Sequence, residues 1–384
     1  TNIKKRYLVF LICNNNLETI IGYLGFIKSN CVTTLIDEKT NDYFLLNIIS
    51  KYKPHYIFIS NKKKISLKGY STEFVFYNYS LLRRTKEIKI KLHNDLMLLM
   101  STSGSTGSTK FVRQSYTNLV SNTKSISNFL NISELDNAIT TLPMSYVYGL
   151  SVINTHLENG GSITLNNLSI IQKGFWERIY KNKVTNFAGV PYTYEIIDKL
   201  DLKKFNLKFL KYTTQAGGKI PIRITKNIIS KYEKSDIKLI IMYGASEATA
   251  RMTYLSWKDV KKKPESIGKA IPGGKIWLEN KFEKKINLIN ENGELIYKGK
   301  NVSLGYATNL KDLNKGNVNN LILRTGDIGY KDKDGYFYLV GRKDRFIKIN
   351  GLRVNLSEVE DIILKMNIKS MCLKGEPNKI LIYI

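Results

Sequence analysis

The sequence predicts an α/β protein with a large N-terminal domain of parallel α/β sheets and a β-rich subdomain, followed by a small, shortened α+β C-terminal domain. Three observations support this fold class. The composition of the 384 residues, 43% hydrophobic and 24% charged, is that of a folded globular chain. Apolar runs alternate with helical patterns in the first hundred residues. After about residue 255, short strands are separated by glycines. Disordered, collagen-like and coiled-coil chains are excluded.

The N-terminal region is predicted to form a βαβαβ unit. Apolar, β-prone runs occupy residues 7–12, 32–36 and 56–60, and helical patterns occupy residues 17–28 and 43–52. Continuous rather than alternating apolar strands favour a parallel sheet that is covered on both faces. Ligands of such sheets bind beyond the carboxyl ends of the strands. Residues 96–100 are the next expected strand.

A glycine- and hydroxyl-rich loop follows that strand. Residues 101–110 contain two glycines and seven hydroxyl side chains and end in Lys110. Backbone N–H groups, hydroxyls and an ammonium group together can bind phosphate. The alternative, a flexible linker, fits poorly between a buried strand and the amphipathic segment 118–130. Two residues separate Gly107 from Lys110, so the loop is not a Walker A motif.

A second motif follows the apolar strand predicted at residues 239–242. It reads Tyr243-Gly244-Ala245-Ser246-Glu247. An aromatic ring, a hydroxyl and a carboxylate at the carboxyl end of a strand could stack a base, contact a phosphate and hold Mg²⁺. Farther on, short strands are expected at residues 293–297 and 321–323, the second directly before Arg324-Thr325-Gly326-Asp327.

These segments together resemble the adenylate-forming superfamily, which contains acyl-CoA synthetases, the adenylation domains of peptide synthetases and firefly luciferase. Residues 102–110, 243–247, 324–327 and 341–348 are similar to its motifs in order and spacing. Lesser matches lie at residues 142–149, 189–191, 215–218, 268–273 and 293–306, so the resemblance covers essentially the whole chain. It implies an AMP-binding N-terminal domain at residues 1–342 and a truncated C-terminal domain at residues 343–384.

The resemblance implies an ATP-dependent acid–thiol ligase. The carboxylate of a small acid would attack the α-phosphate of ATP, pyrophosphate would leave, and the phosphopantetheine thiol of a carrier protein or of CoA would then displace AMP. Positioning and charge neutralisation supply most of the catalysis in such a transfer. The alternative is a degenerate nucleotide-binding or assembly protein that retains the fold without full turnover.

The resemblance also assigns residue roles. Lys110, Ser246, Glu247 and Arg342 would act with Thr106 in catalysis, Glu247 as the Mg²⁺ ligand, and Asp327 would accept both ribose hydroxyls. The other nucleotide contacts would be Thr102, Ser103, Gly104, Ser105, Gly107, Gly217, Gly218, Lys219, Tyr243, Gly244 and Ala245, with adenine between Tyr243 and the two glycines at 217 and 218. Tyr146, Val147, Gly149 and Gln215 would contact the acid, Asp344 would be the hinge, and Gly351 would lie on the thiol path. In the structural alternatives, Asp327 is a turn residue and Glu247 a carboxylate at a helix N-terminus.

The sequence departs from the family pattern at three places. Ser246 replaces the more usual threonine, and Tyr146 stands where acyl-CoA synthetases frequently have histidine. Only about forty residues follow Asp344, and Lys374 and Lys379 lie too early to be the family's late lysine. We therefore expect a truncated product, an adenylation that is slower without this lysine, or a partner that supplies the missing part.

Charge bears on the partners. Sixty basic and 32 acidic residues give a net charge of +28, but the lysines are spread over the chain in short clusters without the arginine–aromatic pattern of strand binding. Nucleic acid is not an expected partner. A biased composition would explain the charge. The positive charge nevertheless favours an acidic carrier protein over CoA as acceptor. No carboxylate lies between Pro143 and Glu158, so we expect an acid without a free α-amino group.

A cytoplasmic location is expected. The three cysteines are too few and too scattered for a disulfide framework, which indicates a reducing compartment. The longest apolar runs are far shorter than the roughly 20 residues that a membrane-spanning helix needs. Lys4-Lys5-Arg6 precedes a short apolar run that is better explained as a buried first strand than as a secretory signal.

Overall fold

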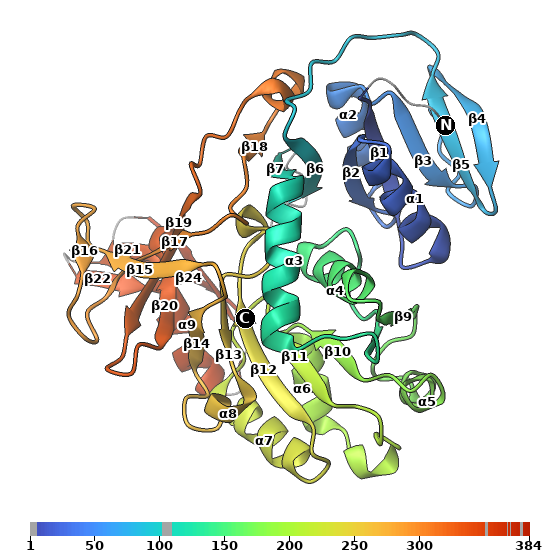
Figure 1. Ribbon diagram of the computed structural model, residues 1–384. Coiled ribbons are helices and arrows are strands. Elements are labelled where there is room, and N and C mark those ends of the chain that lie inside the picture. Colours follow the sequence, from blue (N-terminus) through green and yellow to red (C-terminus); the bar gives the residue numbers. More distant parts are fainter. Residues whose placement is uncertain (1–5, 102–109, 350–351, 367, 369, 377–378) are drawn as a thin grey trace.

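The computed structural model describes residues 6–101, 110–349, 352–366, 368, 370–376 and 379–384. Within these residues the chain forms one eight-stranded sheet, one twelve-stranded sheet and two two-stranded sheets (Figure 1). The fold is mixed α/β with a small C-terminal part, as the sequence predicts.

The eight-stranded sheet contains the predicted βαβαβ unit. Its strand order is β18-β7-β6-β2-β1-β3-β5-β4, and β1 pairs in parallel with both β2 and β3. The unpredicted outer strands are antiparallel, because connections as short as those between β4 and β5 and between β6 and β7 cannot hold a crossover helix. The elements are β1 (Leu8–Cys13), α1 (Leu17–Lys28), β2 (Val32–Asp37), α2 (Asp42–Tyr52), β3 (Tyr56–Ser60), β4 (Tyr70–Phe76), β5 (Tyr79–Arg84), β6 (Leu96–Ser101), β7 (Phe111–Ser115) and β18 (Gly305–Ala307).

The twelve-stranded sheet begins as an α/β layer. Its strands β8 to β12 run parallel and are covered by helices. Residues of α5, α6 and α7 pack with these strands in one apolar core that contains Phe175, Trp176 and Phe187. The elements are α3 (Tyr116–Leu130), β8 (Asn137–Ile139), α4 (Val147–Glu158), β9 (Ser162–Thr164), α5 (Lys173–Lys181), β10 (Asn186–Gly189), α6 (Pro191–Lys199), β11 (Tyr212–Gln215), α7 (Ile222–Glu233) and β12 (Lys238–Tyr243).

The β-rich region continues this same sheet through antiparallel pairs from β12 to β13 and from β13 to β14. Its strands and short helix are β13 (Thr253–Leu255), α8 (Trp257–Val260), β14 (Ser266–Ala270), β15 (Lys275–Glu279), β16 (Lys285–Ile286), β17 (Gly293–Lys298), β19 (Ile322–Lys331) and β20 (Phe337–Arg342). The strand expected at residues 321–323 is therefore wrong in extent, because β19 has ten residues and includes Asp327.

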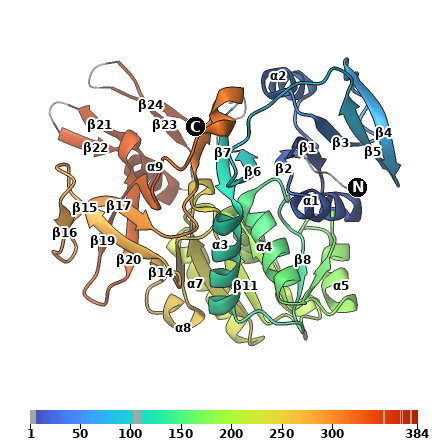
Figure 2. The same ribbon diagram turned by 45° about the horizontal axis from the view of Figure 1, so that its top comes forward.

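The C-terminal part is small. It comprises the pair β21 (Phe346–Ile349) and β22 (Leu352–Asn355), the helix α9 (Leu356–Lys365), and the pair β23 (Met371–Lys374) and β24 (Ile380–Tyr383). Leu356, Ile347 and Cys372 form its buried apolar cluster. α9 lies close to β20 (Figure 2), so this part contacts the β-rich end of the large sheet.

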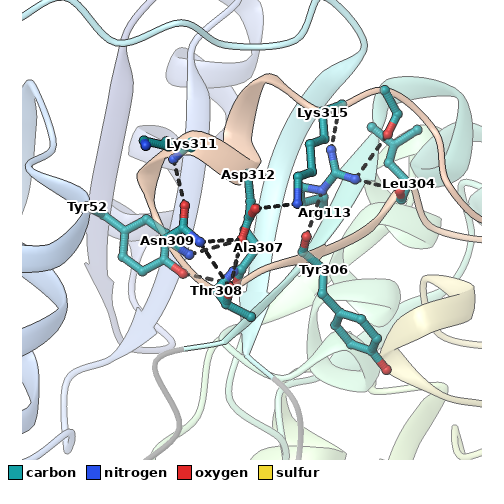
Figure 3. Close-up of polar contacts among 11 residues, drawn as sticks. Tyr52, Arg113, Leu304, Tyr306, Ala307, Thr308, Asn309, Lys311, Asp312 and Lys315 are labelled. Carbon is teal, nitrogen blue, oxygen red and sulfur yellow. Dashed lines mark hydrogen bonds and ion pairs between the residues drawn. The ribbon is translucent and has the colours of Figure 1, made fainter.

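A long crossover returns from the β-rich region to the first sheet, where β18 pairs with β7. Arg113 of β7, which is fully buried, holds this crossover (Figure 3). Its Nε donates to the carbonyl of Tyr306 at 3.1 Å, and its Nη2 donates to the carbonyls of Leu304 and Gly316 at 2.7 and 3.0 Å. Its Nη1 donates to the carbonyl of Lys315. One guanidinium group thus satisfies four carbonyls of the crossover segment.

Asp312 holds the same crossover from the inside (Figure 3). Its carboxylate accepts from the backbone and hydroxyl of Thr308 at 2.7 and 2.8 Å and lies 2.7 Å from Lys315 Nζ. Burial acts to raise the pKa of Asp312, but Lys315 and Thr308 lower it more, so this pKa lies well below its ordinary value. The ionised carboxylate therefore stabilises the folded protein at neutral pH.

No helix in the described part of the chain is long and apolar enough to cross a membrane.

We predict that Asp312→Asn lowers the free energy of unfolding by about 2–3 kcal/mol at pH 7, because charge-assisted hydrogen bonds are lost. A depressed folded-state pKa gives stability that is present above the unfolded-state pKa and is lost as the pH falls toward the folded-state pKa. The difference between variant and wild type should therefore shrink below about pH 5 in urea unfolding. Asp236→Asn is the control, since Asp236 is exposed. A difference that stays constant down to pH 3.5 contradicts the prediction.

Candidate active site

A cavity of about 330 Å³ lies where the parallel strands β11 and β12 end. Gln215 and Tyr243 are the last residues of these neighbouring strands, and both line the cavity. The cavity also reaches β14, the middle of β19 and the end of β20 in the β-rich region. Of the residues singled out in the sequence, those that line it are Tyr146, Val147, Gln215, Gly217, Gly218, Lys219, Tyr243, Gly244, Ala245, Ser246, Asp327 and Arg342.

Asp327 is the centre of a polar cluster in the cavity wall. The hydroxyl of Tyr243 donates to its Oδ2, and Arg342 Nη1 lies 3.2 Å from its Oδ1. Arg342 also extends toward Asp344, with 3.5 Å between Nε and Oδ1. Both oxygens of the Asp327 carboxylate thus have a fixed donor, one from β12 and one from β20.

Burial controls the protonation of this cluster. It raises the pKa of Asp327, although Tyr243 and Arg342 act to lower it. Burial and the charge of Asp327 raise the pKa of Tyr243 well above its ordinary value, so the phenol keeps its proton at neutral pH. Tyr243 is therefore a hydrogen-bond donor to the carboxylate.

A bulge in β19 gives Asp327 its position. The pairing of β19 with β17 shifts register between Glu294 and Ile296, which stand opposite Ile328 and Arg324. Within the bulge, Gly326 has a φ of +72°, a backbone conformation that residues with a side chain rarely adopt. The Thr325 hydroxyl donates to Leu295 O at 2.8 Å and accepts from Asp327 N at 3.0 Å. Such a bulge re-aims one side chain, here Asp327, away from the regular alternation of the strand.

The loop from Tyr243 to Met252 carries Ser246 and Glu247. It closes tightly, since a Cβ atom on Gly244 would lie 1.7 Å from the carbonyl oxygen of Ala250. The Tyr243 carbonyl accepts from Met252 N at 2.9 Å. Gln114 of β7 donates to the carbonyl of Ser246 at 2.9 Å, which ties this loop to the first sheet.

Glu247 meets the crossover segment at Tyr306. The Tyr306 hydroxyl donates to Glu247 Oε1 at 2.6 Å, and Lys110 Nζ lies 3.3 Å from the centroid of the Tyr306 ring. Burial and the charge of Glu247 raise the pKa of Tyr306, so its hydroxyl is protonated at neutral pH. Tyr306 thereby connects the end of the glycine- and hydroxyl-rich loop with the carboxylate, although Lys110 and Glu247 lie far apart in the sequence.

The remaining predicted residues lie as follows. Gln215 Nε2 donates to Gly218 O at 2.7 Å, and a Cβ atom on Gly217, whose φ is +86°, would lie 2.9 Å from the Tyr146 hydroxyl oxygen. Gly149 is buried within α4 against Pro143 O and is not among the residues lining the cavity. Asp344 is exposed in a short turn after β20. Outside the described residues are Thr102, Ser103, Gly104, Ser105, Thr106, Gly107 and Gly351.

Arg251 and Gln114 contribute to the site but were not identified from the sequence, and Tyr306 was noted only as part of a lesser motif. Arg251 lines the cavity, and 3% of its surface is exposed. The available signal in the sequence was a charged residue between the apolar residues Ala250 and Met252, shortly after a motif. Gln114 gave no such signal, because the carbonyl that it contacts belongs to Ser246, 132 residues later in the chain.

The comparisons with known proteins agree with this fold. The family model described as AMP-binding enzyme matches residues 1–307. Similar proteins include the long-chain-fatty-acid–CoA ligase of Bacillus subtilis (strain 168), 28% identical over 76% of this chain and 52% of that protein. The probable 4-coumarate–CoA ligase 2 of Dictyostelium discoideum is 30% identical over 75% of this chain and 52% of its own length. The match over most of the chain and the fold together define a family of AMP-binding enzymes.

The chain belongs to this AMP-binding enzyme family. Among solved structures, O-succinylbenzoate coenzyme A synthetase from Bacillus subtilis in complex with ATP and magnesium ion superposes with a TM-score of 0.78 at 20% identity, covering 98% of this chain and 78% of that one. This likeness shows a shared fold. The chain spans about half the length of the two curated relatives described above.

We predict that Gly244→Ala lowers the free energy of unfolding by about 3 kcal/mol, because the new methyl group meets the backbone of Ala250 rather than a flexible side chain. Urea unfolding measures the effect. Gly25→Ala in α1 is the matched control. Gly25 is exposed and has nothing within 4 Å of an added Cβ, so this change should stabilise the protein by about 0.5–1 kcal/mol. Equal stability of the two variants would show that the loop is not held as described.

Proposed function

We propose that this chain activates a carboxylic acid with ATP to form an acyl-adenylate and then transfers the acyl group to a phosphopantetheine thiol. In the first step, a carboxylate oxygen of the acid bonds to the α-phosphorus, and the bond between this phosphorus and pyrophosphate breaks. In the second step, the thiolate attacks the acyl carbon and AMP leaves with the electron pair of the broken C–O bond. The observation that carries the proposal is the cluster of Asp327, Tyr243 and Arg342 in the wall of the same cavity as Ser246.

Asp327 would bind the ribose. Its two oxygens can accept from the two vicinal hydroxyls of a ribose, and the fixed donors Tyr243 and Arg342 hold the carboxylate in place for this purpose. Arg342 would add positive charge near the phosphates. Adenine would lie by Tyr243 and by Gly217 and Gly218, which line the same cavity.

Ser246 would donate a hydrogen bond to the α-phosphate from a loop that Gln114 holds through its backbone. Lys110 would balance the charge of the β- and γ-phosphates together with the loop at residues 102–107. Charge on these groups increases in the transition state, so fixed donors and cations there accelerate the reaction rather than only bind ATP.

Glu247 fits a magnesium ligand. Mg²⁺ in nucleotide sites is commonly held by one or two carboxylates together with phosphate oxygens. Among the hydrogen bonds of the described residues, the Glu247 carboxylate accepts one, from Tyr306 at Oε1, and this bond orients the group. When bound, Mg²⁺ would neutralise phosphate charge. Tyr306 would position the carboxylate for it.

We predict that Glu247→Gln removes most of the pyrophosphate-exchange activity but leaves ATP affinity within a few-fold of wild type. The amide fills the same space yet is a poor ligand for Mg²⁺. Exchange rates at saturating ATP and equilibrium binding of ATP measure the two effects separately. Tyr306→Phe is the matched variant: it keeps the carboxylate and removes only its donor, so about a tenfold loss is expected.

Unchanged exchange by Glu247→Gln at millimolar Mg²⁺ would rule out the metal role of Glu247. Nucleotide binding by the wild type without exchange on any acid would instead indicate the second candidate, a protein that retains the fold and binds nucleotide without turnover.

The acceptor is proposed to be an acidic carrier protein in preference to free CoA. The net charge of +28 would speed its encounter with a negatively charged partner, whereas CoA needs only a local basic patch. We predict that loading of an acidic holo-carrier protein is faster than loading of CoA at low salt and slows at physiological salt. Faster loading of CoA at both salt concentrations, with no salt dependence for the carrier, would reverse the choice.

A further inference from the structure

The cavity has a second charged group apart from the nucleotide cluster. Arg251 lies in its wall with Tyr146 and Val147 at the N-terminus of α4. The guanidinium carbon of Arg251 stands 3.7 Å from the centroid of the Tyr148 ring, and Tyr148 is itself fixed by a 2.8 Å hydrogen bond to Thr214 O. Arg251 is therefore held in one orientation by stacking.

Two of the three guanidinium nitrogens of Arg251 are unused. Nη1 donates to Ala250 O at 3.0 Å, while Nε and Nη2 are buried without a hydrogen-bond partner among the described residues. No carboxylate of the described residues forms an ion pair with this side chain, although other arginines, such as Arg342 and Arg223, do form one. An arginine stays charged in proteins, so its burial with unused donors is costly.

Arg113 provides the internal comparison. It is equally buried, and all three of its nitrogens donate to backbone carbonyls. The same fold that gives every nitrogen of Arg113 an acceptor leaves Nε and Nη2 of Arg251 without one. The difference is that Arg251 lines the cavity and Arg113 does not. A partner for Arg251 can therefore come with a ligand.

The two free nitrogens define the partner. Nε and Nη2 form one edge of the planar guanidinium group, and their parallel N–H bonds match the two oxygens of a carboxylate. A reacting carboxylate would lose its charge on adenylation and would leave Arg251 unpaired again. A second carboxylate, which takes no part in the reaction, compensates the cation before and after that step.

We propose, building on the adenylation function above, that Arg251 binds the non-reacting carboxylate of a dicarboxylic acid and selects this class of substrate. The acid lies in the cavity with one carboxylate at Ser246, where it is activated, and the other at Arg251, farther along the same loop. Tyr146 and Val147 contribute the wall between them. This assignment narrows the expectation of an acid without an α-amino group to an acid with two carboxylates.

The experiment compares each dicarboxylic acid from malonic to adipic with its own monoamide, which has the same shape but one charge fewer. Pyrophosphate exchange by the wild-type chain gives kcat/KM for every pair. For the best dicarboxylic acid we expect a preference over its monoamide of at least about thirtyfold, the cost of leaving a buried charge unpaired. Arg251→Met should reduce this ratio by at least about thirtyfold, and Arg251→Lys, which keeps the charge without the paired edge, should lie between.

Arg223→Met is the control, since Arg223 is an exposed arginine of α7 paired with Asp198, and its ratio should equal that of the wild type. Thermal unfolding checks the fold of each variant. If Arg251→Met does not fold, the wild-type ratio still decides, because it needs no variant. Exchange with monoamides or monocarboxylic acids as fast as with dicarboxylic acids, or a ratio that Arg251→Met leaves unchanged, overturns the proposal while adenylation stands.

Absence of exchange with every acid would count against the adenylation function, and equilibrium binding then tests Arg251 by itself. Calorimetry with the best-binding dicarboxylic acid in the presence of AMP should show binding to the wild type that is weaker by at least about thirtyfold in Arg251→Met. Equal binding to both proteins, or binding to neither, overturns the proposal.

Discussion

The buried guanidinium group of Arg113 is the interaction on which the arrangement of the site depends. It joins four carbonyls of the crossover segment to β7 and so brings residues beyond position 300 back to the first sheet. The crossover carries Tyr306, which contacts both Lys110 and Glu247. Gly305, with a φ of +112° and Val318 Cγ2 2.4 Å from an added Cβ, permits the close approach of the chain there. Arg113, which does not line the cavity, thus helps to set the position of the Glu247 carboxylate through Tyr306.

The cavity is built from two groups of strands. Parallel strands β11 and β12 end together, as a sheet of this type requires, and supply Gln215, Tyr243 and the loop after Tyr243. The β-rich region supplies Asp327 through a bulge and Arg342 through the end of β20. Because β13 and β14 continue the sheet without a break, the second set of residues is fixed relative to the first. The hydrogen bond from Tyr243 to Asp327 connects the two sets of residues directly.

Much of this was predictable from sequence, and the exceptions share a physical cause. The strands 96–100 and 239–242 and the helix at 17–28 follow from local apolar patterns, and the structure confirms them with shifts of one residue at some ends. The polar motif after β12 could be located because a strand end and its loop are contiguous. The bulge at Asp327 could not, because it is defined by a partner strand about thirty residues earlier. Gln114, Arg113 and Tyr306 act through pairings of still longer range, which no local pattern contains.

Arg113 and Arg251 show how one residue type serves two purposes at equal burial. Where the backbone offers carbonyls in fixed positions, every nitrogen of a guanidinium group donates a hydrogen bond and the side chain becomes part of the framework. Where it stacks on Tyr148 at a cavity wall and keeps one edge unused, it is held in place without being satisfied. A framework arginine is stable without a ligand, whereas the second arrangement gains from one. Burying an unpaired charge costs more free energy than an imperfect apolar fit. The unpaired donors of Arg251 are therefore a better guide to the ligand than the shape of the cavity.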